Sequence, residues 1–390
     1  MRRRHGGGHA RGGSQAPEWA DLTGRFTYQN DLVNRFGGIF SPTSGKAGQG
    51  VMAPSGRATI RDVARAAGVS ATTVSHVLNG KGAVAAATRE RILRTAAELR
   101  YRANPVAQSL RGGRTGVIAL AIRPLDAIGY TLQGVDYFVR LAGAAATAAL
   151  DHGFGLMLVP DLTRRSVPAA LNLDGGIVVD PFVGDPVLAE LLDRGLPVVS
   201  TGRDPARPEH LWWTGTDDRA ETRRVLDLLA ERGARRIAFV AGTDDNAWNH
   251  DTIEAYLSWA EEHGQEPILE QVPEKHGEAA GGEVGGLLLS RPNPPDAIFA
   301  NTGRHAASIA RTAIDLGWDI PGRLLVAAGS DSEQTRFATP GITALDLAPE
   351  ATGRLAIELL LERLAGEPGS VPPRTVPATL HERGSTARPH

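Results

Sequence analysis

The 390-residue sequence contains no cysteine, so it can form neither a disulfide nor a thiolate metal site. No apolar run reaches the roughly 18 to 20 residues that a membrane-spanning helix needs. The N-terminal segment MRRRHGGGHARGG also lacks the apolar core of a secretory signal. These absences predict a cytoplasmic protein without a membrane segment.

Motifs of common catalytic sites are absent as well. The chain has no G-x-S-x-G elbow, no G-x-x-x-x-G-K-[ST] phosphate loop and no H-E-x-x-H zinc motif. The pairs Gly281-Gly282 and Gly285-Gly286 do not lie between a strand and a helix, as a dinucleotide-binding loop requires. His250 and Asp251 are adjacent but have no third partner at a useful spacing. We therefore predict that the protein is not an enzyme and uses no cofactor or metal.

Charge is distributed unevenly, although the formal net charge is only −2. Residues 57–114 carry eleven Arg and Lys against three acidic residues, a net charge of +8. Residues 1–56 carry +4, which leaves −14 for residues 115–390. A basic module joined to an acidic body favours a polyanionic partner for the module alone.

Residues 1–56 are rich in Gly, Ser and Arg and have no sustained periodicity. Such composition predicts a disordered extension, because little apolar surface can be buried. Two alternatives are a mis-assigned start with Met52 as the initiator, and a nucleic-acid-binding arm formed by MRRRH and HARGG.

Residues 59–100 have the pattern of three short helices. Thr59 can cap the first, with Asp62 as its capping-box partner, and Gly68 ends it. Its apolar face is formed by Ile60, Val63, Ala64 and Ala67. Ser70 can cap the second helix.

In the second helix the apolar residues Val74, Val77 and Leu78 point inward. The residues turned outward are small and polar: Thr72, Thr73, Ser75, His76 and Asn79. A third helix, from about Ala87 to Arg100, is expected to bury Ile92, Leu93, Ala96 and Leu99. Small polar side chains suit a helix that enters the major groove, so this pattern and the local charge indicate a DNA-binding helix-turn-helix.

From Gly116 onward, short apolar runs alternate with helical stretches. The runs are VIALAI, GLMLVP, GIVVD, LPVVS, RIAFVAG, AIFA and LLVAAG. The helical stretches are Val139–His152, Pro186–Arg194, Asp218–Arg232, Thr252–His263 and Ala306–Leu316. Runs without alternation are typical of parallel strands buried on both faces. The length of about 275 residues predicts two α/β subdomains with a cleft between them.

On these segments the chain resembles the lactose-repressor/purine-repressor family of bacterial transcription regulators, over nearly all of residues 58–387. TIRDVARAAGVSATTVSHVLNG, TRERILRTAAELRY and NPVAQSLR resemble its headpiece and hinge. DGGIVVDP, LPVVSTGRDP, DLGWDIP and TALDLAPEATGRLAIELLLERLAGE resemble its sensor. The resemblance implies a small all-α helix-turn-helix headpiece and an α/β sensor of two doubly wound parallel-sheet subdomains, like a periplasmic binding protein.

The expected domains follow from this resemblance. Residues 57–103 form the DNA-binding domain, residues 104–114 the hinge, and residues 115–390 the effector-binding and dimerisation domain. Within the last, the N-subdomain covers about 115–213 and 347–367, and the C-subdomain about 214–346 and 368–390.

The resemblance also implies roles for the second helix. Thr72 and His76 would reach base edges, and Thr73, Ser75 and Asn79 would mainly contact phosphates. Histidine can donate a hydrogen bond to guanine N7 or O6, so His76 is expected to tune the operator sequence.

The hinge is expected to couple the headpiece to the sensor. Tyr101 would support the headpiece on the DNA backbone, and Asn104 to Arg111 would become helical when two protomers meet over the operator. Leu110 would be a wedge in a minor-groove base step. The alternative for Leu110 is packing on its own chain.

Five residues match effector-binding positions of the family: Tyr137, Phe138, Asp217, Asn301 and Asp331. The aromatic pair could stack on a ring, and the Asp331 carboxylate could accept hydrogen bonds from hydroxyls or ring N–H groups. The alternatives are core aromatics for the pair and helix caps for Asp217 and Asp331.

Other positions depart from the family pattern. Thr252 replaces an arginine, Thr302 an aspartate and Ser330 an aromatic residue. These departures predict an unusual effector, or none. A different pocket could be built by Trp212, Trp213, Trp248, Asn246 and His250.

We therefore predict a sequence-specific DNA-binding transcriptional regulator, a repressor, in the cytoplasm and associated with the nucleoid. Its partners would be a near-palindromic operator, a second copy in a homodimer or a tetramer, and a small-molecule effector such as a sugar or related metabolite. Two alternatives are a regulator without an effector and a sensor like a solute-binding protein, which would need an export signal and no headpiece.

Overall fold

The computed structural model describes residues 58–78, 82–101, 114–123, 136–159, 172–366 and 373–387. The expected N-terminal extension 1–56 and nearly all of the hinge 104–114 lie outside these residues. Within the described residues, no helix combines the length and the apolar character that a membrane span requires.

The headpiece consists of α1 (Ile60–Ala67), α2 (Ala71–Leu78) and α3 (Ala86–Glu98). The predicted capping box is present: the Asp62 amide donates to Thr59 Oγ1 at 3.3 Å, and the Thr59 amide donates to Asp62 Oδ2 at 2.9 Å. Gly68 ends α1 in the left-handed region with φ 63°. Ser70 Oγ accepts from the Thr73 amide at 3.1 Å, so the predicted second cap is also confirmed.

The headpiece core gathers one face of each helix. Its buried members are Val63, Ala64, Ala67, Val74, Val77, Ile92 and Ala96. Two predicted core residues of the third helix are instead exposed, Leu93 by 49% and Leu99 by 38%. Leu93 lies about 100° around the helix from Ile92, and Leu99 follows the last helical residue.

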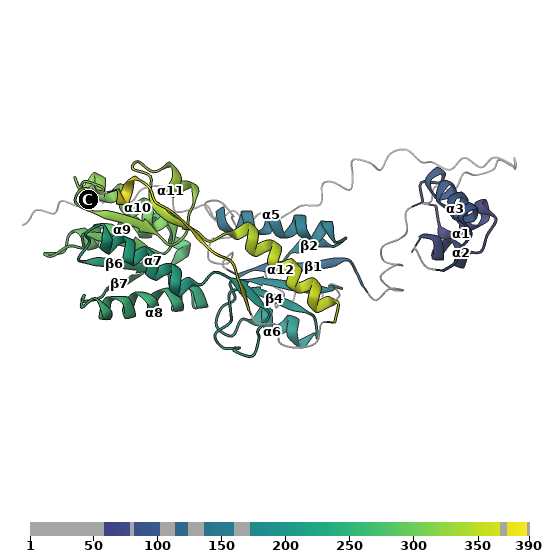
Figure 1. The fold of residues 1–390 in the computed structure, drawn as a ribbon, viewed down its shortest axis with the longest axis horizontal. Helices are drawn as coiled ribbons and strands as arrows, with labels where there is room; N and C mark the ends of the chain where they lie inside the picture. Colours follow the sequence, from purple (N-terminus) through teal and green to yellow (C-terminus); the bar gives the residue numbers. More distant parts are fainter. Residues whose placement is uncertain are drawn as a thin grey trace, which may run out of the picture. The chain divides into compact units, whose positions relative to one another are not determined.

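The first lobe contains a parallel sheet, of which Figure 1 labels β1, β2 and β4. In the described residues the strand order of this sheet is β11-β5-β4-β3-β1-β2. The strands are β1 (Val117–Ile122), β2 (Gly155–Leu158), β3 (Gly175–Val179), β4 (Val198–Thr201), β5 (Trp213–Gly215) and β11 (Arg374–Thr375). Side chains of α5 (Asp136–Asp151) and α12 (Pro349–Leu364) pack on one face, and those of α6 (Pro186–Asp193) on the other.

The second lobe repeats this plan with the order β12-β10-β9-β8-β6-β7. Its strands are β6 (Ile237–Ala241), β7 (Ile268–Gln271), β8 (Ala297–Ala300), β9 (Leu325–Ala328), β10 (Thr343–Asp346) and the antiparallel β12 (Thr379–His381). One face packs on α7 (Asp218–Glu231) and α8 (Ala247–Glu262), the other on α9 (Gly277–Leu289) and α10 (Gly303–Asp315). Short helices are η2 (Glu274–His276), α11 (Glu333–Phe337) and η3 (Gly384–Thr386).

The predicted fold class, with its buried parallel strands, is therefore confirmed. One predicted helix begins earlier than expected: α8 starts at Ala247, because the Asn246 side chain accepts from the Asn249 amide at 3.0 Å and caps it.

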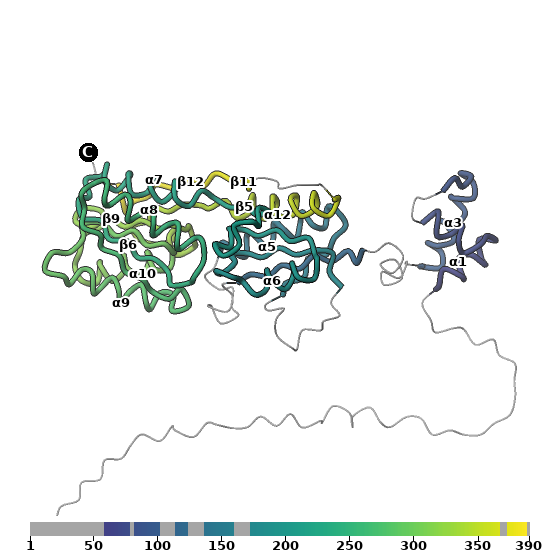
Figure 2. Tube along the Cα trace, turned by 90° about the horizontal axis from the view of Figure 1, so that it is seen from below, coloured from purple at the N-terminus to yellow at the C-terminus, as the bar shows by residue number. Residues whose placement is uncertain are grey.

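The position at which the C-terminal part of the chain crosses from the first lobe to the second also differs from the prediction. Since β11 pairs with β5 of the first lobe, the chain enters the second lobe after Thr375 and not at about residue 368 (Figure 2).

The glycine pairs at 281–282 and 285–286 lie inside α9, which the sequence did not predict as a helix. They allow α9 to approach α10 closely. A Cβ on Gly281 would lie 2.8 Å from His305 Cα, and one on Gly285 would lie 3.2 Å from Ile309 Cα. The glycines therefore serve helix packing and not phosphate binding.

Candidate nucleic-acid interface and ligand cavity

Helix α2 divides its residues between core and surface. Val74 and Val77 are buried, whereas Thr72 and His76, one helical turn apart, are exposed. The backbone of Gly82, with φ 81°, lies close to the His76 ring. A Cβ at Gly82 would be only 3.1 Å from His76 Nδ1. The two predicted base-reading side chains therefore share one open face.

The other predicted DNA contacts are less exposed or lie outside the described residues. Thr73 and Ser75 are half-buried, and Thr73 Oγ1 lies 2.8 Å from Ser70 Oγ. Tyr101 packs against the headpiece core. Asn79, Asn104, Leu110 and Arg111 are not among the described residues.

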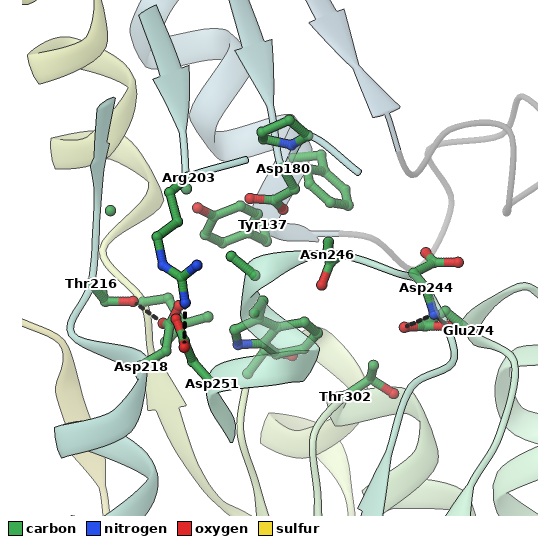
Figure 3. Close-up of a pocket in the computed structure, with 18 of the residues that line it drawn as sticks. Tyr137, Asp180, Arg203, Thr216, Asp218, Asp244, Asn246, Asp251, Glu274 and Thr302 are labelled. Carbon is green, nitrogen blue, oxygen red and sulfur yellow. Dashed lines mark hydrogen bonds and ion pairs between the residues drawn. The ribbon is translucent and has the colours of Figure 1, made fainter. Parts of the chain in front are cut away.

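A cavity lies between the two lobes, at the carboxyl ends of their parallel strands (Figure 3). Each sheet contributes lining residues just after its strands end. From the first lobe these include Asp180 after β3 and Arg203 after β4, and from the second Asp244 after β6 and Thr302 after β8. Open α/β sheets commonly bind ligands at this edge, so the topology itself places a binding site here.

Aromatic side chains form part of the cavity wall. Tyr137 and Phe138 at the start of α5 line it, with ring centroids 5.3 Å apart in an edge-to-face arrangement. Trp213 and Trp248 line it as well. The cavity therefore offers apolar ring faces beside its polar groups.

The lobes touch beside the cavity. Phe182 and Asn246 form a backbone bridge, and the Val183 amide donates to the Asp245 carbonyl at 2.8 Å. Arg203 Nη2 lies 2.5 Å from Asp251 Oδ1. The structure thus has the two walls of the cavity in direct contact.

Three carboxylates in the cavity have raised pKa values. Burial, together with the charge of Asp218, raises the pKa of Asp180 to about 7. Burial raises the pKa of Asp218 to about 7 as well, although the Thr216 hydroxyl donates to it at 2.6 Å. Burial and the neighbouring Glu274 raise the pKa of Asp244 to about 6.

Asp180 also has a positive φ of 49°, as only Arg100 and Ala348 do among the other non-glycine residues that the structure describes. A non-glycine residue keeps this left-handed backbone conformation only where the surrounding structure fixes it, and such residues cluster at functional sites. Its backbone is fixed by an amide hydrogen bond to the Thr201 carbonyl at 2.9 Å.

Of the five predicted effector residues, the structure brings Tyr137 and Phe138 to the cavity but not the others. Asp217 is exposed and caps α7, where it accepts from the Ala220 amide at 3.1 Å. One residue further along the helix, Asp218 lines the cavity instead.

Asn301 is fully buried behind the cavity wall. Its Nδ2 donates to Asn249 Oδ1 at 3.1 Å and to Thr252 Oγ1 at 3.0 Å. Thr252, where relatives are expected to have arginine, is therefore engaged in an internal hydrogen bond. The neighbouring Thr302 lines the cavity in place of Asn301.

Asp331 does not line the cavity either. Its side chain is 3% exposed and pairs with Arg383 at 2.8 Å and with Arg336 at 3.1 Å. The Thr335 hydroxyl donates to it at 2.5 Å. Although burial would raise its pKa, hydrogen bonds from Arg383 and Thr335 hold that pKa below its usual range.

The alternative pocket expected from the sequence is partly present. Trp213, Trp248 and Asn246 line the cavity. Trp212 is buried beneath Arg363, and His250 pairs with Asp245 at 2.7 Å, so neither reaches it.

Residues missed by sequence reasoning are mostly acidic or cationic groups that follow strands: Asp180, Arg203, Asp218, Asp244, Asp251, Glu274 and Arg304. Asp180 could have been predicted from the sequence, because the apolar run GIVVD ends in this carboxylate.

Asp218→Asn is expected to stabilise the ligand-free protein by about 1 kcal/mol near pH 8 and by less near pH 5. Because the pKa of Asp218 is raised, the folded state keeps a proton on this group between about pH 4 and 7, where the unfolded state has lost it. The ionisation of Asp218 therefore lowers the free energy of unfolding as pH rises through this range. Thermal melts at both pH values measure the difference. Asp217→Asn, on the exposed neighbour, should show no such pH-dependent gain.

Comparisons with known proteins give matches at both ends of the chain. The family model described as bacterial regulatory proteins, lacI family, matches residues 59–104. The model of a periplasmic binding protein-like domain matches residues 226–386.

Similar proteins extend the likeness over most of the chain. The HTH-type transcriptional regulator PtxS of Pseudomonas aeruginosa is 32% identical over 345 residues, which cover 86% of this chain and 98% of that protein. The regulator CelR of Thermobifida fusca is 28% identical, over 80% of this chain and 93% of that protein.

Two solved structures have a similar fold. A CelR–cellobiose complex is 26% identical with a TM-score of 0.63, covering 84% of this chain and all of that chain. A lac repressor dimer bound to operator and the anti-inducer ONPF is 22% identical with a TM-score of 0.73, covering 85% and 99% of the two chains. The second likeness concerns the fold alone.

Proposed function

Because this chain belongs to the lacI family of bacterial regulatory proteins, we propose that α2 reads an operator and that a ligand in the inter-lobe cavity controls this reading. The protein is a helix-turn-helix transcriptional regulator and not an enzyme. We propose a homodimer as its DNA-bound form, since two headpieces related by a two-fold axis read a near-palindrome.

The observation that carries this proposal is the division of α2. Val74 and Val77 are buried in the headpiece, while Thr72 and His76 share one exposed face. We assign base-edge contacts to these two residues and phosphate contacts to Thr73, Ser75 and Asn79. The basic charge of residues 57–114 supports binding to the DNA backbone.

The hinge completes the proposed DNA-binding unit. Tyr101 supports the headpiece on the DNA backbone, and Asn104 to Arg111 link it to the sensor. Leu110 is assigned to the minor-groove wedge, where an apolar side chain would unstack a base step and bend the operator.

The effector site we propose is the cavity that Figure 3 shows, and it replaces part of the set expected from the sequence. Tyr137 and Phe138 remain in it, and Asp180, Asp218 and Trp248 join them. CelR has been solved with cellobiose. In this chain the acidic and aromatic side chains that line the cavity indicate a ligand of different chemistry. A ligand shifts operator binding only if its affinity differs between the form of the protein that binds DNA and a form that does not.

His76→Ala tests the DNA-reading role. Binding sites would first be selected from a random DNA pool with the full-length protein, and affinities then measured for every base at each operator position. The variant is expected to lose about 1 to 3 kcal/mol of discrimination at one position per half-site, because one base-edge contact disappears. Other positions should keep their preferences.

The matched control is His152→Ala, which removes an exposed histidine of the sensor and should leave base preference unchanged. If His76→Ala weakened binding equally for all sequences, the residue would contact only the backbone. Failure to select any sequence would contradict operator binding itself.

A further inference from the structure

The inter-lobe cavity has an excess of negative charge. Five carboxylates line it: Asp180, Asp218, Asp244, Asp251 and Glu274. Only two guanidinium groups do so, those of Arg203 and Arg304. Among the described lining residues, the carboxyl groups therefore outnumber the guanidinium groups by three.

Both arginines are already engaged with protein groups. Arg203 pairs with Asp251 at 2.5 Å. Arg304 donates to the Glu274 carbonyl oxygen at 3.1 Å, which does not neutralise a carboxylate. Neither forms an ion pair with Asp180, Asp218 or Asp244 among the described contacts.

Of the four carboxylates without an arginine partner in the cavity, Glu274 accepts hydrogen bonds from the Thr243 amide at 3.0 Å and from Asn249 Nδ2 at 2.7 Å. The other three, Asp180, Asp218 and Asp244, have weaker local compensation. Asp180 receives one long hydrogen bond, from Thr201 Oγ1 at 3.5 Å, and Asp218 receives one from the Thr216 hydroxyl at 2.6 Å. Burial is the main cause of the raised pKa values of Asp180, Asp218 and Asp244, and the charges of neighbouring carboxylates raise these pKa values further. A neutral polyol would supply hydrogen bonds but would leave the mutual repulsion in place, whereas a cation would remove it.

The carboxylates do not converge on one point. Figure 3 shows Asp180, the pair Asp218 and Asp251, and the pair Asp244 and Glu274 on different sides of the cavity. Among the described residues there is no group of three or more His, Asp or Glu that could hold a metal ion. The arrangement suits a charge carried on an extended body better than a bare metal ion.

The wall between these charges is aromatic. Tyr137, Trp213 and Trp248 line the same cavity. Aromatic faces attract organic cations and also hold their apolar portions. Acidic groups with aromatic faces in one enclosed site form the combination that recognises amines.

We propose that the effector of this protein is an organic cation, a small molecule with a protonated amine on an apolar or ring-shaped body. This inference rests on the proposed function of the cavity as the effector site. The carboxylates of Asp180 and Asp218 pair with the ammonium group, and the aromatic wall covers the body of the ligand.

Matched amines and alcohols test the proposal on the full-length protein. Putrescine would be compared with 1,4-butanediol, and benzylamine with benzyl alcohol. Within each pair hydroxyl groups replace the ammonium groups, two in putrescine and one in benzylamine, and the carbon body is the same. Binding is followed by tryptophan fluorescence, since Trp213 and Trp248 line the cavity. At least one amine should bind about tenfold or more tightly than its alcohol, equivalent to about 1.4 kcal/mol.

Two variants test whether the amine binds in the inter-lobe cavity. Asp218→Asn should weaken amine binding about tenfold or more and leave alcohol binding unchanged. Asp217→Asn, which alters the exposed cap beside it, should bind amines as the parent does. Equal weakening by both variants would mean that the amine binds outside the cavity, which overturns the proposal.

The remaining outcomes separate this inference from the proposed function. If alcohols bound as tightly as amines, or if neither amine bound at millimolar concentrations, the cationic class would be wrong. Release of a selected operator by neutral sugars but not by amines would also overturn it while supporting the regulator function. Absence of any selected operator would instead contradict the function, whatever the cavity binds.

Discussion

Asp331→Ala is expected to lower the free energy of unfolding by about 3 to 5 kcal/mol, the largest effect among the substitutions considered. The carboxylate is buried and accepts two hydrogen bonds from Arg383, at 2.8 and 3.0 Å, and one from Arg336 at 3.1 Å. Removing it leaves the Arg383 guanidinium without its carboxylate partner. Arg336 retains Asp136, at 2.6 Å.

Urea unfolding of the variant and the parent measures this loss. Asp315→Ala, an exposed carboxylate on the same lobe, is the control and should change stability by no more than about 0.5 kcal/mol. The pKa of Asp331 is depressed in the folded state, so its stabilisation is present above its unfolded pKa and is lost as pH falls through the folded one. The two proteins should therefore converge in stability in acid.

The same variant separates two roles for Asp331. An effector-binding carboxylate would lose the ligand response at little cost in stability. The ion pairs in the structure favour the opposite result, a large loss of stability. A variant with parental stability and no ligand response would restore the effector role expected from the sequence.

Gly353→Ala is expected to destabilise the first lobe by about 2 to 3 kcal/mol. A Cβ at this position of α12 would lie 2.5 Å from the Leu141 carbonyl oxygen and 3.2 Å from the Ala145 amide nitrogen of α5. Both are backbone atoms, so no side chain can rotate away. The helices must separate, and the general gain of alanine over glycine in a helix is outweighed.

Gly143→Ala provides a matched control on α5, the other helix of this contact. A Cβ there would meet no atom within 4 Å, so helix propensity alone should raise stability by up to about 1 kcal/mol. Denaturant unfolding of both variants gives opposite signs. A stabilised Gly353→Ala protein would show that α12 and α5 can separate without loss.

Helix caps and buried strands were predictable because each depends on residues close in sequence. Thr59 and Asp62 form the capping box within one turn, and VIALAI lies as a strand buried in the first sheet. Tyr137 came instead from matching the chain to the family, and this residue lines the cavity.

The rest of the effector site was not predictable, because one residue of displacement decides which side chain faces the cavity. Asp218 lines it while Asp217 caps a helix, and Thr302 lines it while Asn301 is buried. Those choices depend on how loops from two lobes meet, and matching positions to a family does not resolve them. The family resemblance identified the segments that line the cavity. It did not determine which residue of each neighbouring pair, Asp217 or Asp218 and Asn301 or Thr302, faces the cavity.

The discontinuous lobes have a consequence for biosynthesis. Among the described residues, five strands of the first sheet end by Gly215, but its edge strand β11 comes at Arg374–Thr375, and the helix α12 that covers the sheet begins only at Pro349. A ribosome must therefore make most of the second lobe before the first can finish folding. No contiguous fragment of the chain contains a complete first lobe without most of the second lobe inserted within it, and the second lobe is itself completed only when β12 follows β11.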